Sequence, residues 1–188
     1  MTVARSTDGR LLTQAVEALF DPGSAAAGGS AAAIAAALAA TVLANIARSG
    51  GDHGRAAQGA ALGMRLARLA GGDAQVLAVA RALLENAAEG GNATRDFDLG
   101  RALDEAVSAP LAIAEASADV AILAAELCPL TDPDLAPDAV SAAILASAAA
   151  RAAAHLVEAN LGVSAVDERA IRARAAAAAA EKAAAEAL

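Results

Sequence analysis

Aromatic side chains are almost absent from this chain of 188 residues, which has no tryptophan, no tyrosine and only two phenylalanines. Lysine occurs once, at Lys182, and the formal net charge is −8. Proteins that bind nucleic acid need a basic surface, and those that bind single strands usually add stacking aromatic rings. The composition therefore excludes nucleic acid as a main partner.

Cysteine also occurs once, so Cys128 has no partner for an internal disulfide, which fits a reducing compartment. Four charged residues fall within the first 20 positions, and no signal-peptide pattern is visible there. We expect a cytoplasmic protein. The most apolar run, 31–47, is near the lower length limit for a membrane span, and we expect it to be a buried helix rather than a membrane anchor.

Alanine dominates what is present, with 64 of the 188 residues, and 57% of the chain is apolar. Alanine favours helices because it loses no side-chain entropy there, and strand formers are sparse. The composition predicts an all-α fold. Each alanine buries little apolar surface, and burial stabilises a fold by only roughly 25 cal/mol per Å². We therefore expect association into a homodimer to supply additional buried surface.

Hydrophobic periodicity and turn residues predict a single domain over 1–188, an up-and-down bundle of about six helices. The expected helices cover 6–20, 30–48, 55–89, 95–127, 138–161 and 165–187. Glycines at 71 and 72 are expected to kink or split the third helix, and Pro110 is expected to bend or interrupt the fourth. The first helix is amphipathic, and the second is apolar nearly all round and so central.

The sharpest local motif is the stretch Ala-Ala-Gly-Gly-Ser at positions 26–30, which precedes a long apolar helix. Free backbone N–H groups at a helix start attract anions, and glycine lets a ligand approach the backbone. The alternative is an ordinary loop with Ser30 as the N-cap. The wider stretch 23–30 resembles a Walker A loop, but it lacks the lysine and a preceding strand, so we do not expect nucleotide binding.

Four titratable residues are candidates for acid–base chemistry: Asp73, Asp138, His53 and His155. Asp73 and Asp138 follow helix-breaking residues, so each is either a helix N-cap or a carboxylate held in a cleft. The two histidines lack nearby cysteine or acidic partners at metal-ligand spacing, and we expect no metal site. No nucleophile-elbow pattern is present.

The order of the segments is more informative than any one motif. The Gly-Gly-Ser helix start is followed by Asn45, by Asp73, by Pro110 inside a helix, by Asp138 leading a helix, and by Asn160 near that helix's end. This series resembles the cyclodeaminase/cyclohydrolase family, which includes the C-terminal domain of formimidoyltransferase-cyclodeaminase and stand-alone methenyltetrahydrofolate cyclohydrolases. The resemblance covers about 10–188.

The resemblance implies an enzyme that acts on the one-carbon amidine unit of a folate, a small-molecule substrate, with no cofactor. Asp73 and Asp138 match the family pattern, and our hypothesis is that they are the catalytic carboxylates, with His53 or His155 as the proton shuttle. The substrate-binding positions that the resemblance implies are Gly28, Gly29, Ser30, Asn45 and Asn160.

The chain departs from the family pattern at several positions, including Leu156, where the family has an asparagine, and the segments 48–54 and 81–85. Three functions therefore stay open. The first is a cyclohydrolase or cyclodeaminase of folates, which would be a C–N hydrolase or an ammonia lyase. The second is an enzyme of another cyclic amidine or imine, and the third is a non-catalytic helical dimer.

Overall fold

The computed structural model describes residues 28–87, 93–161 and 167–188, apart from the side chains of 72–87, 93–100, 102 and 103. The helix predicted over 6–20 lies outside these residues. Within the described part, the chain forms five α-helices and one short 3-10 turn, with no β-strand, so the all-α prediction is confirmed. The elements are α2 (Gly28–Ser49), α3 (His53–Ala87), α4 (Ala93–Leu127), η1 (Cys128–Leu130), α5 (Ala136–Leu161) and α6 (Glu168–Glu186).

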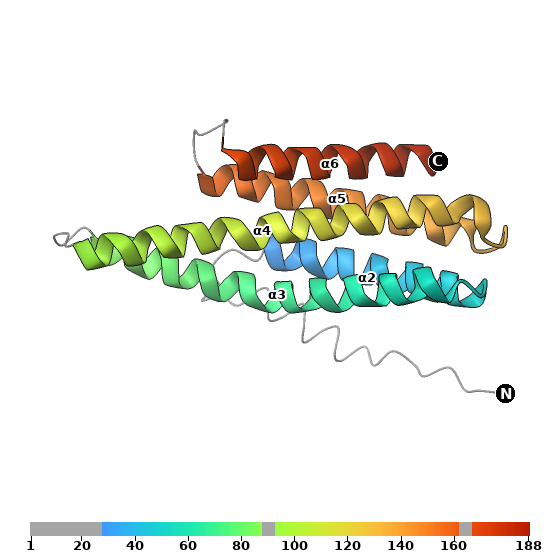
Figure 1. Ribbon diagram of the computed structural model, residues 1–188, viewed down its shortest axis with the longest axis horizontal. Helices are drawn as coiled ribbons and strands as arrows, with labels where there is room; N and C mark the ends of the chain where they lie inside the picture. The colour runs from blue at the N-terminus through green and yellow to red at the C-terminus, as the bar shows by residue number, and fades with distance from the viewer. Residues whose placement is uncertain (1–27, 88–92, 162–166) are drawn as a thin grey trace.

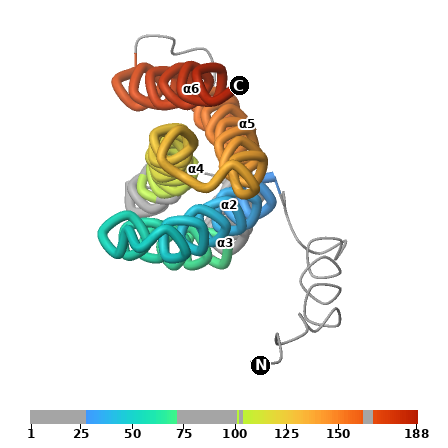
Figure 2. Tube along the Cα trace, turned by 90° about the vertical axis from the view of Figure 1, so that its right-hand side faces the viewer, coloured from blue at the N-terminus to red at the C-terminus, as the bar shows by residue number. Residues whose placement is uncertain are grey.

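The five helices run alternately up and down along one long axis (Figure 1). Viewed from the end, α2 and α3 lie together, α4 and α5 cover them, and α6 packs on the outer side of α4 and α5 (Figure 2). The far halves of α3 and α4 extend beyond the start of α2 (Figure 1). The up-and-down arrangement predicted from the sequence is therefore observed among the described helices.

The turn between α2 and α3 falls where the glycine-rich break was predicted. Gly51 takes a positive φ of 79°, a conformation that side chains rarely allow. The carboxylate of Asp52 then accepts a hydrogen bond from the backbone N–H of Arg55 at 2.9 Å and another from the Arg55 guanidinium at 2.7 Å. This bonding lowers the pKa of Asp52, the backbone hydrogen bond being the largest cause, and it fixes the first turn of α3.

The core of the described residues is built mainly from alanine, and its largest fully buried side chains include Leu43, Leu66 and Ile113. Small residues let the helices approach closely. At Gly59 of α3, a Cβ atom would lie 3.1 Å from the carbonyl oxygen of Ala40 in α2. Backbone proximity of this kind replaces the interdigitation of large side chains seen in ordinary cores.

Helix α6 is held to its neighbours by alanine contacts and arginine ion pairs. Arg169 contacts Asp104 of α4 at 2.8 Å, and Arg172 contacts Glu115 of α4 at 2.6 Å. The buried residues of α6 are all alanine. Each exposed ion pair contributes little to the free energy of folding, so these pairs orient α6 more than they stabilise it.

Neither of the two interruptions expected inside helices is observed, while a kink at Gly71 and Gly72 and a bend at Pro110 stay predictions. Helix α3 is continuous across Gly71 and Gly72, so Asp73 lies within the helix and is not an N-cap. Helix α4 is likewise continuous across Pro110. Two glycines cost a helix about 2 kcal/mol in propensity, which the packing of a 35-residue helix can offset.

Helices α2 and α5 are each long and apolar enough to cross a membrane by length and composition alone. In their most apolar windows, 56% and 50% of the residues are buried inside the bundle. Helix α2 lies among α3, α4 and α5 (Figure 2), as predicted for the run 31–47.

Candidate active site

The start of α2 brings three other helices together. Ser30 is buried inside the first turn of α2, and its hydroxyl donates a hydrogen bond to the carbonyl oxygen of Ala70 in α3 at 2.7 Å. A Cβ atom on Gly28 would lie 3.6 Å from a methyl group of Leu156 in α5. The helix begins two residues before Ser30, so the alternative of Ser30 as the N-cap is wrong.

Position 160 connects this region to α4. The side-chain nitrogen Nδ2 of Asn160 donates a hydrogen bond to the carbonyl oxygen of Ala106 at 2.9 Å. Asn160 lies one helical turn beyond Leu156 on α5. The bond ties the last turn of α5 to the middle of α4, so a residue predicted to bind substrate has a structural contact in this chain.

Asp73 belongs to the same region by its place on the backbone. It lies in α3, three residues beyond the Ala70 carbonyl that Ser30 contacts, while its side chain is outside the described part. Gly28, the first residue of α2, is exposed, and no acidic residue lies in the first turn of α2. The partial positive charge of a helix N-terminus favours an anionic or carbonyl ligand, and no acidic residue of the described first turn offsets it.

The other predicted residues of the site lie elsewhere in the monomer. His53 is the first residue of α3, at the far end of the bundle, and Asn45 lies near that end of α2, where its Oδ1 atom accepts a hydrogen bond from Arg48 at 2.8 Å. Asp138 lies exposed in the first turn of α5, which begins at Ala136, so Asp138 is not its N-cap. Along α5, Asp138 is about 27 Å from Leu156 at 1.5 Å per residue.

His155 neighbours Leu156 in sequence but faces a different groove. It lines a hollow of about 260 Å³ between α5 and α6, together with Arg151, Glu158 and Arg174. Arg174 contacts Glu158 at 3.0 Å, and Arg151 contacts Glu181 at 3.4 Å. His155 is exposed there, so a single chain does not place the four predicted acid–base residues in one site.

Two further hollows lie on the outer side of α4, and sequence reasoning did not find either. The larger, about 440 Å³, lies between α3 and α4 and includes Asp119, Leu62 and Ile122. Burial raises the pKa of Asp119, with a smaller contribution from nearby Glu115, while Arg65 opposes the shift. No motif marks Asp119, because it is one acidic residue in an alanine-rich helix.

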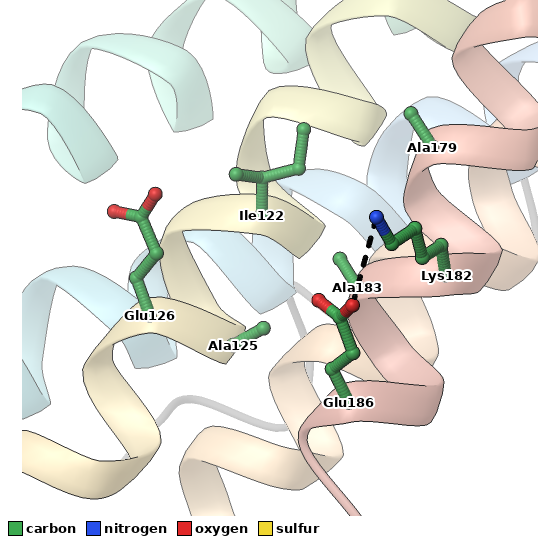
Figure 3. A pocket seen from close by; sticks show the side chains of 7 residues that line it. All are labelled: Ile122, Ala125, Glu126, Ala179, Lys182, Ala183 and Glu186. Atoms are coloured by element: carbon green, nitrogen blue, oxygen red, sulfur yellow. Dashed lines mark ion pairs between the residues drawn. The ribbon is translucent and has the colours of Figure 1, made fainter.

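The second outer hollow, of about 360 Å³, lies between α4 and α6 (Figure 3). Its lysine, Lys182, contacts Glu186 at 3.7 Å, one turn further along α6. Glu126 borders the hollow from α4. Glu126 in turn contacts Arg55 of α3 at 3.7 Å, so each charged side chain that borders this hollow has an ion-pair partner.

The described residues contain no group of three or more histidine, cysteine or acidic side chains that could hold a metal ion. The carboxylates and histidines whose side chains the structure describes are dispersed along the bundle. Among the described residues, the start of α2, with no acidic residue in its first turn and the Asp73 backbone nearby, is the best candidate for a binding and catalytic site.

Comparison with known proteins gives a consistent result. The family model for formiminotransferase-cyclodeaminase matches residues 12–181. A crystal structure of formiminotetrahydrofolate cyclodeaminase from Thermotoga maritima has a TM-score of 0.76 and 18% sequence identity, covering 99% of this chain and 96% of that chain. No curated protein sequence matches significantly. At this identity the structural match shows the fold, whereas the family match spans most of the sequence, and the chain belongs to the formiminotransferase-cyclodeaminase family.

Proposed function

We propose that the chain acts on the one-carbon amidine unit of a folate, as a methenyltetrahydrofolate cyclohydrolase or a formiminotetrahydrofolate cyclodeaminase. The observation that carries the proposal is the family match over residues 12–181. The fold match to a cyclodeaminase over nearly the full length of both chains supports it. The first turn of α2 contains no acidic residue, which supports locating that chemistry at this end of the helix.

Both reactions involve a cationic carbon between two nitrogens. In the cyclohydrolase reaction, water forms a C–O bond to the methenyl carbon and loses a proton, and one C–N bond then breaks as its nitrogen takes up a proton. In the cyclodeaminase reaction, a folate nitrogen bonds to the formimino carbon, and ammonia leaves. An anionic group beside the cation and a group that moves a proton serve either reaction.

We assign the carboxylate role to Asp73, because its backbone is less than one helical turn from the Ala70 carbonyl that contacts the α2 start. The backbone N–H groups of Gly28 and Gly29 would hold a carboxylate or ring carbonyl of the substrate. Ser30 would keep α2 and α3 in register through its bond to Ala70.

The test is to mix purified protein with 5,10-methenyltetrahydrofolate and follow the loss of near-ultraviolet absorbance against the spontaneous rate. A parallel assay with formiminotetrahydrofolate measures ammonia release. We expect a protein-dependent rate in one assay, and Asp73→Asn should lower it by about 10²–10⁴-fold. Asp134→Asn, at an exposed carboxylate in the η1–α5 turn, is the matched control. A folded protein without a rate above background in either assay would refute the proposal.

One observation favours a second candidate, an enzyme of another cyclic amidine or imine. Leu156 occupies a position where the family pattern has an asparagine, and its methyl groups lie beside Gly28 at the candidate site. A leucine there offers an apolar contact in place of an amide. A substrate that is less polar than a folate would fit this change, and turnover of such a compound in the absence of folate turnover would establish it.

A further inference from the structure

The hollow between α3 and α4, which we call the α3/α4 hollow, has the size and lining of a small-molecule site. Its volume is about 440 Å³. Four apolar and two polar residues line it, and these are Ala61, Leu62, Ile122, Leu123, Gln58 and Asp119. Sites for small organic molecules have volumes of about 300–1,000 Å³, and their walls are mostly apolar with a few polar groups. The α3/α4 hollow meets both conditions.

The carboxylate in this hollow has no partner. Within the described part of the chain, the side chain of Asp119 forms no ion pair and no hydrogen bond. Arg65 of α3 attracts it electrostatically, but no ion pair joins the two side chains. Asp119 therefore contributes a negative charge that the protein leaves available.

The acidic residues that line the other two hollows are all paired. In the hollow between α5 and α6, the partners of Glu158 and Glu181 are Arg174 and Arg151. In the hollow between α4 and α6, the partners of Glu126 and Glu186 are Arg55 and Lys182. An unpaired carboxylate thus distinguishes the α3/α4 hollow from both of these surfaces.

The surroundings of Asp119 favour a cation that also carries apolar atoms. Burial is the largest cause that raises the pKa of Asp119, and nearby Glu115 adds to it. The charged carboxylate is therefore poorly solvated, and a cation beside it would compensate. An apolar group attached to that cation would cover the half-buried side chains of Leu62 and Ile122.

We propose that the α3/α4 hollow binds an organic ammonium ion with an apolar body, and that Asp119 is its counter-ion. The ammonium group donates hydrogen bonds to the carboxylate, and such charge-assisted bonds are stronger than neutral ones. The apolar body lies on the aliphatic side chains of α3 and α4. An anionic ligand is disfavoured, because Asp119 would repel it.

This site is separate from the candidate active site. Leu62 lies eight residues before Ala70, which is about 12 Å along α3 at 1.5 Å per residue. Gly59 and Gly63 face α2, whereas Gln58, Ala61 and Leu62 line the hollow beside α4. The inference therefore does not rest on the proposed function, and a folate assay does not test it.

Three probes of similar size test the charge preference in NMR titrations of the full chain. They are 2-phenylethylamine, the uncharged 2-phenylethanol and the anionic phenylacetate. We expect the amine to bind about five- to ten-fold more tightly than the alcohol, and phenylacetate to bind most weakly. Equal affinities for the amine and the alcohol would overturn the role of the carboxylate.

Asp119→Asn removes the charge and keeps the shape of the side chain. The dissociation constant for 2-phenylethylamine should rise by about five- to ten-fold, while that for 2-phenylethanol should stay within about two-fold. Asp134→Asn, at an exposed carboxylate in the η1–α5 turn, is the matched control and should change neither value. An unchanged affinity of Asp119→Asn for the amine would refute the proposal.

The apolar part of the site is tested by Ile122→Gln. This substitution should weaken the binding of the amine and of the alcohol alike, because both probes lose the same apolar contact. Leu145→Gln makes a similar change at an exposed leucine of α5 and should affect neither probe. If Ile122→Gln and Leu145→Gln bind the amine equally well, the ligand does not lie in the hollow.

The pH dependence of binding provides an independent readout. The charged groups that act on Asp119 are Arg65 and Glu115, and Glu115 is paired with Arg172 at 2.6 Å. The amine needs the charged carboxylate, whose pKa is raised, so the affinity should begin to fall at a higher pH than for an ordinary aspartate. Asp119→Asn should remove this dependence. A dependence that persists in Asp119→Asn would assign it to another group.

Chemical-shift changes locate the bound amine. We expect the largest changes at the backbone amides of 58–62 and 119–123, on the two helices that line the hollow. Changes confined to the start of α2 would show that the amine enters the candidate active site instead, and would overturn the proposal. This result would leave the proposed function intact, whereas an inactive protein that binds the amine at α3 and α4 would refute only the proposed function.

Discussion

The side-chain amide of Asn160 supplies the hydrogen-bond donor that Pro110 lacks. Proline has no N–H group, so a proline inside a helix leaves the carbonyl four residues earlier without its helical partner. For Pro110 that carbonyl belongs to Ala106, and Nδ2 of Asn160 donates to it at 2.9 Å. Two residues that are 50 positions apart thus form one structural unit, which lets α4 continue through a buried proline.

Asn160→Ala should therefore destabilise the protein by about 1–3 kcal/mol, the cost of leaving a buried polar group without a partner. Chemical denaturation measures this loss. The same substitution in a Pro110→Ala background should cost less than half as much, because the backbone N–H group that the alanine restores would donate to the Ala106 carbonyl. Equal losses in both backgrounds would show that the two residues are not coupled.

The close approach of α2 and α3 gives a second prediction. At Gly59 an added Cβ would lie 3.1 Å from the Ala40 carbonyl oxygen and 3.2 Å from the Ala44 Cβ. Gly59→Ala should therefore destabilise the fold by about 1–3 kcal/mol, since the helices must separate. Gly63→Ala, whose nearest contacts are at 3.5 Å, should cost less.

Gly71→Ala is the matched control, because nothing lies within 4 Å of the added Cβ in the middle of α3. Replacing glycine by alanine in a helix interior contributes about 0.5–1 kcal/mol of stability. Thermal unfolding of the three variants should rank Gly71→Ala above wild type and Gly59→Ala below it. A stabilising Gly59→Ala would contradict the packing of α2 on α3.

The sequence predicts the helices well and the contacts between them poorly. Alanine content and apolar periodicity predict the ends of α2, α4 and α5 to within a few residues, because helix propensity and the burial pattern indicate the same segments. The glycines at 71 and 72 predict a split in the third helix that is not observed, because the packing of a long helix outweighs two residues with low helix propensity. The position of a glycine shows neither close approach, as at Gly59, nor open space, as at Gly71.

The candidate site shows the same limit. The resemblance identifies Pro110 and Asn160 separately, but only the fold shows that one satisfies the backbone group that the other leaves free. Ser30 fits an N-cap by its local sequence, yet its hydroxyl bonds to a carbonyl 40 residues away. Local patterns list the polar groups, whereas long-range packing decides their partners.

Acid should weaken the attachment of α6 through Asp167. Asp167 is the N-cap of α6, and hydrogen bonds from the side chain and backbone of Arg169 lower its pKa from 3.8 to about 2. Because the folded pKa lies below the unfolded one, this contribution is present above about pH 4 and is lost as the pH falls toward about 2. The charged carboxylate is the stabilising form.

Asp167→Asn isolates this effect, because asparagine can still accept the capping hydrogen bond but does not titrate. The difference in unfolding free energy between wild type and Asp167→Asn should shrink as the pH is lowered from about 5 to about 2. About 1 M salt should also reduce the difference, since ion pairs near the surface are screened. A difference that is constant across this pH range would contradict the role of the charge.

Leu156→Asn should increase the affinity of the protein for a folate, if the leucine at the α2 start is what disfavours a polar ligand. The substitution places an amide beside Gly28, where the methyl groups of Leu156 now lie. One added hydrogen bond contributes about 1 kcal/mol, so the dissociation constant for 5-formyltetrahydrofolate should fall by about five- to ten-fold. Isothermal titration calorimetry measures this change.

Leu135→Asn makes the same substitution at another half-buried leucine, just before α5, and should leave the affinity unchanged. If both variants bind the folate no better than wild type, Leu156 does not set the polarity of the site, and the candidate enzyme of a less polar amidine loses its support.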